Sequence, residues 1–446
     1  MNMQNAFRAF SVVALAIVVG LLAQTTGLTQ GSQPSEFKIA AVSFLSGAAA
    51  APFGVPARNA VELLRDKLNA GAVPAPYDTV GIGGVPITLS TFDESGGAEK
   101  QVEQYRSFVG NFDVVLGYIS SGDCGALAPV VEEVQQLTVF ADCGTNTIFE
   151  EKDTSPAFLF RTHGHQVLDS VGAARYVLAT QADLSSAGGI NQNYSWGQDN
   201  WSTFSATMAQ LAPSVQLSGA PQFPALFAGE YSAEISALLQ EKSDAIFTSF
   251  WGGDLEALII QGTPRGLFDQ STLVMSTADT ALPRLGGDIP EGVVIGGRGP
   301  HGALAPDNAL NAWFTAAYQD RFGVRPVYSA YHYAQAVLGL KTAYEKAIAD
   351  NGSFPDVNQV ISAFEGITFD TPSGTISLTL ANGHQAVEPM VYGTTGANVV
   401  NGERELVNVL EFPAGCVNPP EGTATPDWVA AGLPTPAGVD CAGTAR

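Results

Sequence analysis

The sequence predicts an α/β protein built from parallel sheets with helices on both faces. Short apolar runs alternate with segments of helical periodicity, beginning with a run at 37–44 and a helical segment at 56–69. The loops that follow the first apolar runs are rich in Gly, Ser, Thr and Ala, and the same alternation resumes after residue 166. A chain of 446 residues is too long for one ordinary core, so we expect two or three domains.

The first half of the chain contains a regular series of expected strands and helices. The strands are expected at 37–44, 85–92, 112–119 and 137–141, and the helices between them at 56–69, 98–109 and 126–136. Four small-residue loops, 45–54, 93–97, 120–125 and 142–147, follow the strands. In open sheets of this kind ligands bind outside the carboxyl ends of the strands, so these loops are the first indication of a binding site.

The second half repeats the pattern and then changes. Helices are expected at 166–180, 199–211, 230–241, 254–262, 308–320 and 329–350, with strands at 245–250 and 273–276 and a strand with its loop at 190–197. The segment 367–395 alternates apolar and polar residues around Asn382-Gly383, which predicts antiparallel strands. Residues 413–446 are rich in Pro, Gly and Ala, and we expect an irregular tail there.

The composition excludes one class of partner. The net charge is -23 and only 20 residues are Lys or Arg, so the chain lacks the basic footprint that nucleic-acid binding needs. With 46% hydrophobic and 14% charged residues, the chain is expected to form packed cores rather than remain disordered.

The first 31 residues are interpreted as an export signal. Arg8 precedes an apolar run at 11–23. This run is shorter than the roughly 20 residues of a membrane span and suits the core of a signal peptide. No A-x-A triplet marks a cleavage site, so an uncleaved anchor stays open, and no Cys follows the run to carry a lipid. We expect an exported protein of the periplasm or the outer face of the cell envelope.

Four cysteines in an exported chain predict two disulfides. Cys124 and Cys143 follow successive strand-like runs, and Cys416 and Cys441 lie in the tail, so we expect the pairs Cys124–Cys143 and Cys416–Cys441. Free or differently paired thiols remain the alternative. There is no C-x-x-C and the five His are mostly scattered, so neither a metal site nor a cofactor is expected.

Several stretches, taken together and in order, resemble a known family. They include "FKIAAVSFLSG", "TFDESGGAEKQVEQ", "VVLGYISSGDCGALAPVVEE", "LTVFADCGTN", "INQNYSWGQDNW", "AIFTSFWGGDLEALIIQ" and "GTISLTLANGHQAVEPMVY". Over roughly residues 36–412 the chain resembles the type I periplasmic substrate-binding proteins of ABC transporters, of the branched-chain amino acid and amide group.

The resemblance implies two doubly wound α/β lobes joined by three crossover strands, with the ligand in the cleft between them and hinge closure over it. Mapped onto this chain, lobe 1 holds 36–161 with 299–352, and lobe 2 holds 162–298 with 353–412. The crossings are expected near 160–161, near 296–298, and between the last long helix and the strand at Asp370.

The resemblance also implies the ligand contacts of the first lobe. Ser121 and Thr145 are expected to donate to a ligand carboxylate, and Ser120 to add backbone N–H groups at a helix N-terminus. Cys143 stands where a backbone carbonyl accepts from the ligand amine, and Phe53 stands where an aromatic ring caps the ligand. For Ser121 the alternative is a helix cap that serves only its own helix.

The contacts implied from the second lobe are aromatic and acidic. Trp196 takes the place of a ring that closes over the ligand, with Tyr194 and Trp251 as further candidates. Asp279 is the expected partner of a ligand amine, one position out of the family register, and a solvated loop charge is its alternative.

These expectations lead to a function. The resemblance implies the solute-binding component of an ABC importer, a monomer that captures an amino acid, an amide or a related small carboxylate and delivers it to ABC permease subunits in the membrane. A ligand sensor on the same fold is the alternative. An enzyme is not expected, because the sequence has no G-x-S-x-G and its cysteines are explained by disulfides.

Overall fold

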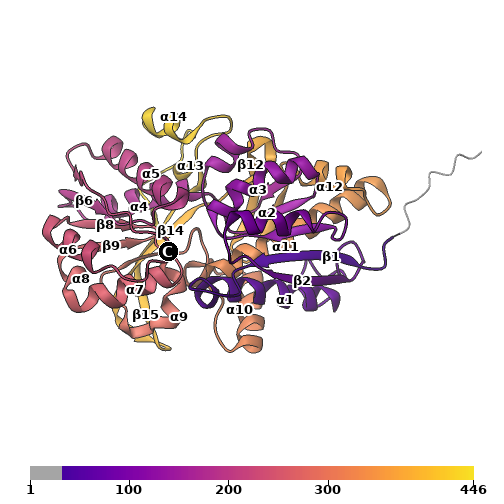
Figure 1. The fold of residues 1–446 in the computed structure, drawn as a ribbon, viewed down its shortest axis with the longest axis horizontal. Helices are drawn as coiled ribbons and strands as arrows, with labels where there is room; N and C mark the ends of the chain where they lie inside the picture. The colour runs from indigo at the N-terminus through magenta and orange to yellow at the C-terminus, as the bar shows by residue number, and fades with distance from the viewer. Residues whose placement is uncertain (1–32) are drawn as a thin grey trace, which may run out of the picture.

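The structure is a computed structural model that describes residues 33–446, and it has two lobes side by side (Figure 1). Each lobe is built around a sheet of eight strands, in the orders β11-β12-β13-β5-β4-β3-β1-β2 and β16-β15-β14-β10-β9-β8-β6-β7. The expected α/β class with two doubly wound lobes is confirmed, since the strands β2-β1-β3-β4-β5 and β7-β6-β8-β9-β10 run parallel. The expected export signal lies outside the described residues.

Lobe 1 forms because alternate residues of its strands bury apolar side chains on both faces. In β1, Phe37 and Ile39 pack on the side of α1 and α11, whereas Ala40 and Val42 pack on the side of α2 and α3. Its elements are β1 (Phe37–Ser43), η1 (Ala50–Gly54), α1 (Val55–Asn69), β2 (Ile87–Asp93), α2 (Ala98–Arg106), β3 (Val114–Gly117), α3 (Ser121–Val134), β4 (Thr138–Phe140), η2 (Ile148–Lys152), β5 (Leu159–Arg161), α10 (Ala309–Phe322), α11 (Tyr328–Asn351), α12 (Val357–Phe364), β11 (Thr368–Thr371), β12 (Gly374–Leu380) and β13 (Gln385–Val387).

Lobe 2 repeats the design, with one strand displaced from its expected place. The strand expected within 190–197 lies earlier, as β6, and Gly189 in it leaves room for the ring of Trp201, which a Cβ would approach to 2.3 Å. The elements are α4 (Gln166–Thr180), β6 (Ser186–Gly189), α5 (Ser195–Leu211), β7 (Gln216–Leu217), α6 (Ser232–Glu241), β8 (Ala245–Thr248), α7 (Gly253–Gly262), η3 (Thr263–Arg265), α8 (Leu267–Gln270), β9 (Thr272–Met275), η4 (Ala278–Thr280), α9 (Leu282–Leu285), η5 (Gly286–Asp288), β10 (Val294–Gly296), η6 (Gly302–Leu304), β14 (Met390–Val400), β15 (Glu403–Phe412), α13 (Ala414–Val417), α14 (Thr425–Ala430) and β16 (Thr444–Ala445).

The chain passes three times between the sheets, and the third passage differs from the expectation. The first two follow β5 and β10, near the expected residues 160–161 and 296–298. The third lies at 388–389, between β13 and β14, because β11 to β13 extend the first sheet. The segment 353–387 therefore belongs with lobe 1 and not, as expected, with lobe 2.

The C-terminal segment 413–446 is packed and not the irregular tail that its composition predicts. It forms α13, α14 and β16, and β16 adds to the second sheet beside β15. Trp428 is fully buried in the core that α4 and α5 share. Both expected disulfides are present, Cys124–Cys143 and Cys416–Cys441. No helix within residues 33–446 has the length and apolarity needed to cross a membrane.

Candidate functional site

A small cavity of about 10 Å³ lies between the lobes, at the carboxyl ends of the parallel strands of both sheets. That volume suffices for about one water molecule. Five of the nine expected ligand contacts line it: Phe53, Ser121, Tyr194, Trp196 and Trp251. The remaining lining residues are Ile119, Asp142, Gly144, Thr277, Arg298 and Tyr328.

Five aromatic rings, from both lobes, line the cavity. Phe53 and Tyr328 of lobe 1 meet edge to face with ring centroids 5.1 Å apart, and Phe53 meets Trp251 of lobe 2 at 5.2 Å. The indole N–H of Trp251 donates to the hydroxyl of Tyr194 at 2.7 Å, which fixes both rings. The aromatic part of the wall is thus shared between the lobes.

Among the residues that the structure describes, Arg298 supplies the only cation of the cavity lining. Its guanidinium donates to the carboxylate of Asp142 at 2.5 Å and to that of Asp169 at 3.3 Å, and it lies 4.6 Å from the ring centre of Trp196. Asp142 follows β4 of lobe 1 and Asp169 belongs to α4 of lobe 2, so this buried arginine ties the lobes together. Burial raises the pKa of both Asp142 and Asp169 to about 7, although Arg298 opposes the rise.

Sequence reasoning did not identify Arg298 as a site residue. Its backbone φ is +53°, a left-handed value that is uncommon for a residue with a side chain. It follows β10 directly at the second crossing, where an arginine flanked by glycines was the available signal.

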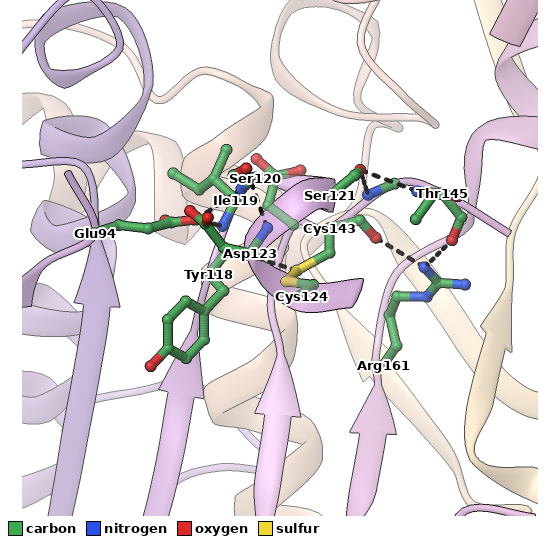
Figure 2. Close-up of a disulfide and its surroundings, with 12 residues drawn as sticks. Glu94, Tyr118, Ile119, Ser120, Ser121, Asp123, Cys124, Cys143, Thr145 and Arg161 are labelled. Carbon is green, nitrogen blue, oxygen red and sulfur yellow. Dashed lines mark hydrogen bonds between the residues drawn. A yellow bond between two sulfur atoms is a disulfide. The ribbon is translucent and has the colours of Figure 1, made fainter. Parts of the chain in front are cut away.

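The N-terminus of α3 is already occupied by a carboxylate (Figure 2). Glu94 accepts from the backbone N–H of Ile119 at 2.8 Å and from that of Ser120 at 2.7 Å. Burial, followed by the charge of Asp123, raises the pKa of Glu94 well above its usual value. Ser120 caps the helix by accepting from the N–H of Asp123 at 3.4 Å. Ser120 is therefore engaged inside the protein, and Glu94 takes the place that we expected an anionic ligand to fill.

Ser121 lines the cavity, whereas Cys143 and Thr145 do not. The Ser121 hydroxyl oxygen accepts from the backbone N–H groups of Gly144 and Thr145, both at 3.2 Å, which leaves its own hydrogen to donate. The carbonyls of Cys143 and Thr145 accept from Arg161 at 2.9 and 2.6 Å (Figure 2). The carbonyl that we expected to meet a ligand amine is thus used by Arg161.

Asp279 is buried but lies outside the cavity lining, where Thr277 takes its place. Its carboxylate accepts from the backbone N–H groups of Ala303 at 2.9 Å and Tyr328 at 2.8 Å, and from Arg325 at 3.1 Å. The short turn η4 directs Asp279 toward the N-terminus of α11, where a helix favours negative charge. The expected amine partner therefore joins the lobes instead.

Thr145 makes a further contact between the lobes, with Asp199 of α5. Burial raises the pKa of Asp199 from 3.8 to about 6, and the hydrogen bond from Thr145 opposes the rise. The folded state therefore binds a proton on the Asp199 carboxylate more tightly than the unfolded chain does. As a result, the free energy of unfolding falls as the pH rises from about 4 to about 6.

Asp199→Asn is expected to remove that part of the pH dependence. The difference in unfolding free energy between the wild type and D199N should change by about 2 kcal/mol between roughly pH 4 and 7. Urea denaturation at each pH measures it. Parallel profiles for the two proteins would show that Asp199 titrates normally.

A larger cavity of about 300 Å³ lies elsewhere, between lobe 1 and residues 419–424 of the C-terminal segment. Arg161 and His165 line it, together with Glu150. It does not lie at the strand ends of both sheets, and none of the nine expected ligand contacts lines it. On position and lining, the smaller cavity is the better candidate site.

Comparison with known proteins agrees with this architecture. Residues 36–397 match the family described as periplasmic binding protein. The chain belongs to the periplasmic binding protein family. No match is found among curated proteins.

Solved structures of solute-binding proteins share the fold of this binding protein. One, from an ABC transporter of Rhodopseudomonas palustris BisB5 in complex with 3,4-dihydroxy benzoic acid, is 18% identical, with a TM-score of 0.70 over 85% of this chain and 98% of that one. A leucine-, isoleucine-, valine-, threonine-, and alanine-binding protein from Brucella ovis is 21% identical, with a TM-score of 0.67 over 88% and 99%. An ABC transporter substrate-binding protein from Sphaerobacter thermophilus is 16% identical, with a TM-score of 0.69 over 85% and 98%.

Proposed function

We propose that this chain is the extracytoplasmic solute-binding component of an ABC importer, acting as a monomer that delivers its ligand to permease subunits in the membrane. The observation that carries the proposal is the cavity at the strand ends of both sheets, with wall residues from both lobes. The family and the solute-binding proteins of similar fold support it. The protein works by binding and hinge closure, with no bond chemistry.

The ligand we propose is a small molecule with a carboxylate and an apolar or aromatic body, amino acids included. The aromatic walls suit the body, and the Ser121 hydroxyl and Arg298 are donors for the carboxylate. One buried oxygen of Asp142 has no hydrogen-bond partner among residues 33–446 and suits an amine. The ligands named for two similar proteins all carry a carboxylate: 3,4-dihydroxy benzoic acid for one, and leucine, isoleucine, valine, threonine and alanine for the other.

Binding of such a ligand requires the site to open. A cavity of about 10 Å³ cannot admit a molecule larger than water. The lobes must therefore separate, or the wall side chains must move, before the ligand binds.

A thermal-shift screen with matched compounds tests the proposal. The chain is unfolded with its disulfides intact and refolded to remove carried-over ligand. It is then mixed with L-phenylalanine, 3-phenylpropionate or phenethylamine, with the corresponding leucine series, and with benzoate. A ligand at about 1,000 times its dissociation constant adds roughly 4 kcal/mol to stability. Stabilisation by the acids or amino acids, but not by the amines, is expected. Stabilisation by the amines alone, or by none, would contradict the proposed ligand class.

Ser121→Ala is expected to weaken ligand binding by about 1–3 kcal/mol, because it removes a donor to a buried polar group of the ligand. Titration calorimetry with the best compound of the screen measures the loss. Ser120→Ala is the matched control, since Ser120 is the neighbouring residue but caps α3 instead of lining the cavity. Ser120→Ala should lower stability and leave affinity unchanged. If Ser121→Ala bound the ligand as tightly as Ser120→Ala does, Ser121 would not be a ligand contact.

A further inference from the structure

Three fully buried side chains meet where the chain crosses between the lobes. His301 lies in the second crossing, His332 belongs to α11, and Glu388 lies in the third crossing. Each offers one nitrogen or oxygen ligand atom, and these atoms all lie within 4.8 Å of one another. The sequence predicted no metal site because these residues are far apart along the chain.

The two histidines are held as metal ligands usually are. Nδ1 of His332 lies 2.7 Å from the carboxylate of Asp142, and Nδ1 of His301 lies 2.6 Å from the hydroxyl of Ser373. An oxygen at Nδ1 favours the tautomer with its proton there, and leaves a lone pair on Nε2. Nε2 of both rings is buried and has no hydrogen-bond partner within the described part of the chain.

Glu388 is a buried carboxylate that no Lys or Arg balances within the described part of the chain. It accepts from Gln335 at 2.6 Å and from the backbone N–H of Gly164 at 3.1 Å. Within residues 33–446, no Lys or Arg pairs with it, and its one ion-pair candidate is His301. A buried carboxylate needs a compensating positive charge, which either a proton on His301 or a bound cation would supply.

The spacing of His301 and Glu388 distinguishes these two possibilities. Nε2 of His301 lies 3.4 Å from the Glu388 carboxylate, yet the two atoms do not form a hydrogen bond. Two ligands of a tetrahedral zinc ion, with bonds of about 2.0–2.1 Å, lie roughly 3.4 Å apart. The geometry therefore fits a shared metal ion better than a shared proton.

We propose that His301, His332 and Glu388 bind one divalent transition-metal ion of the zinc class. Two imidazole nitrogens and one carboxylate oxygen form a donor set that suits Zn²⁺ and leaves a fourth position open. The widest separation in the cluster exceeds a tetrahedral edge, so binding draws the three side chains together.

The position of the site gives the ion a structural role. The metal joins α11 of lobe 1 to the second and third crossings, and Gly164 of the first crossing holds the Glu388 carboxylate. Asp142 contacts both His332 and Arg298 of the cavity lining. The ion thus fixes the hinge beside the ligand cavity, and the proposal does not depend on which ligand binds there.

Metal binding to the untagged full chain tests the proposal. The protein is unfolded with its disulfides intact, stripped with a chelator, refolded with or without Zn²⁺ or Co²⁺, and freed of excess metal. Refolding in the presence of metal gives the ion access to a buried site. We expect one equivalent of Zn²⁺ by elemental analysis, a higher melting temperature, and the absorption bands of tetrahedral Co²⁺.

Variants locate the site. His332→Ala and Glu388→Gln should each weaken zinc binding at least ~100-fold, because they remove a ligand and not only a residue behind it. His384→Asn is the matched control, since His384 is equally buried but packs on Phe160 away from the cluster, and it should retain one equivalent. Glu388→Gln keeps the size of the side chain, so its circular dichroism should stay that of the wild type. No bound zinc in the wild type, or equal binding by wild type and both ligand variants, would overturn the proposal.

Discussion

Arg298→Met should lower the free energy of unfolding by about 3–5 kcal/mol, because it leaves two buried carboxylates without their cation. Asp142 and Asp169 come from different lobes, and both are completely buried. Met keeps most of the apolar length of the arginine side chain. The decrease in unfolding free energy therefore reflects the missing charge and its hydrogen bonds more than a newly formed cavity. Denaturant unfolding followed by circular dichroism measures it.

Two further proteins make this result specific. Arg106→Ala breaks an ion pair with Glu133 on the surface, and its stability should match that of the wild type. The double variant R298M/D142N removes one of the stranded charges and should recover part of the loss. If Arg298→Met were as stable as the wild type, Arg298 would not hold the lobes together.

The fold could be predicted from the sequence wherever local pattern decides it. The alternation in β1 and the helical periodicity of α1 are properties of short segments, and both elements lie close to their expected positions. The sequence pattern predicts the antiparallel pairing of β11 and β12, but it does not predict which of the two sheets the hairpin joins. Both sheets have an edge that another strand can extend, so the pattern alone does not say which edge receives the hairpin.

The site could be predicted only in part, for a related reason. The resemblance to the family implied Phe53, Trp196 and Trp251 as candidate contacts, and all three line the cavity because they lie in segments that follow the carboxyl ends of parallel strands. The direction of a side chain in a tight turn does not follow from the sequence. Asp279 of η4 points to α11, whereas Thr277, the residue just before η4, lines the cavity.

Charged partners from distant segments were the hardest to foresee. Glu94 occupies the N-terminus of α3 and Arg298 joins two carboxylates, but each contact depends on the packing of separate elements. The same holds for the C-terminal segment. Its Pro and Gly content predicts irregular backbone, yet Trp428 supplies enough apolar surface to dock it.

Trp428→Ala should destabilise the protein by about 3–5 kcal/mol, as large-to-small substitutions of aromatic residues in a core do. The ring is fully buried among side chains of α4 and α5, and its indole N–H donates to the carbonyl of Pro434 at 3.0 Å. The substitution therefore removes packing between the C-terminal segment and lobe 2 as well as the hydrogen bond. Thermal and denaturant unfolding measure the loss.

Trp313→Ala is the matched control, because Trp313 of α10 is only partly buried against the core of lobe 1. Its loss should be clearly smaller, since water already reaches part of the ring. The Cys416–Cys441 disulfide stays intact in both variants, so any difference reports the packing of the ring and not the covalent link. If Trp428→Ala cost no more than Trp313→Ala, residues 413–446 would be an appendage held by the disulfide and not part of the core of lobe 2.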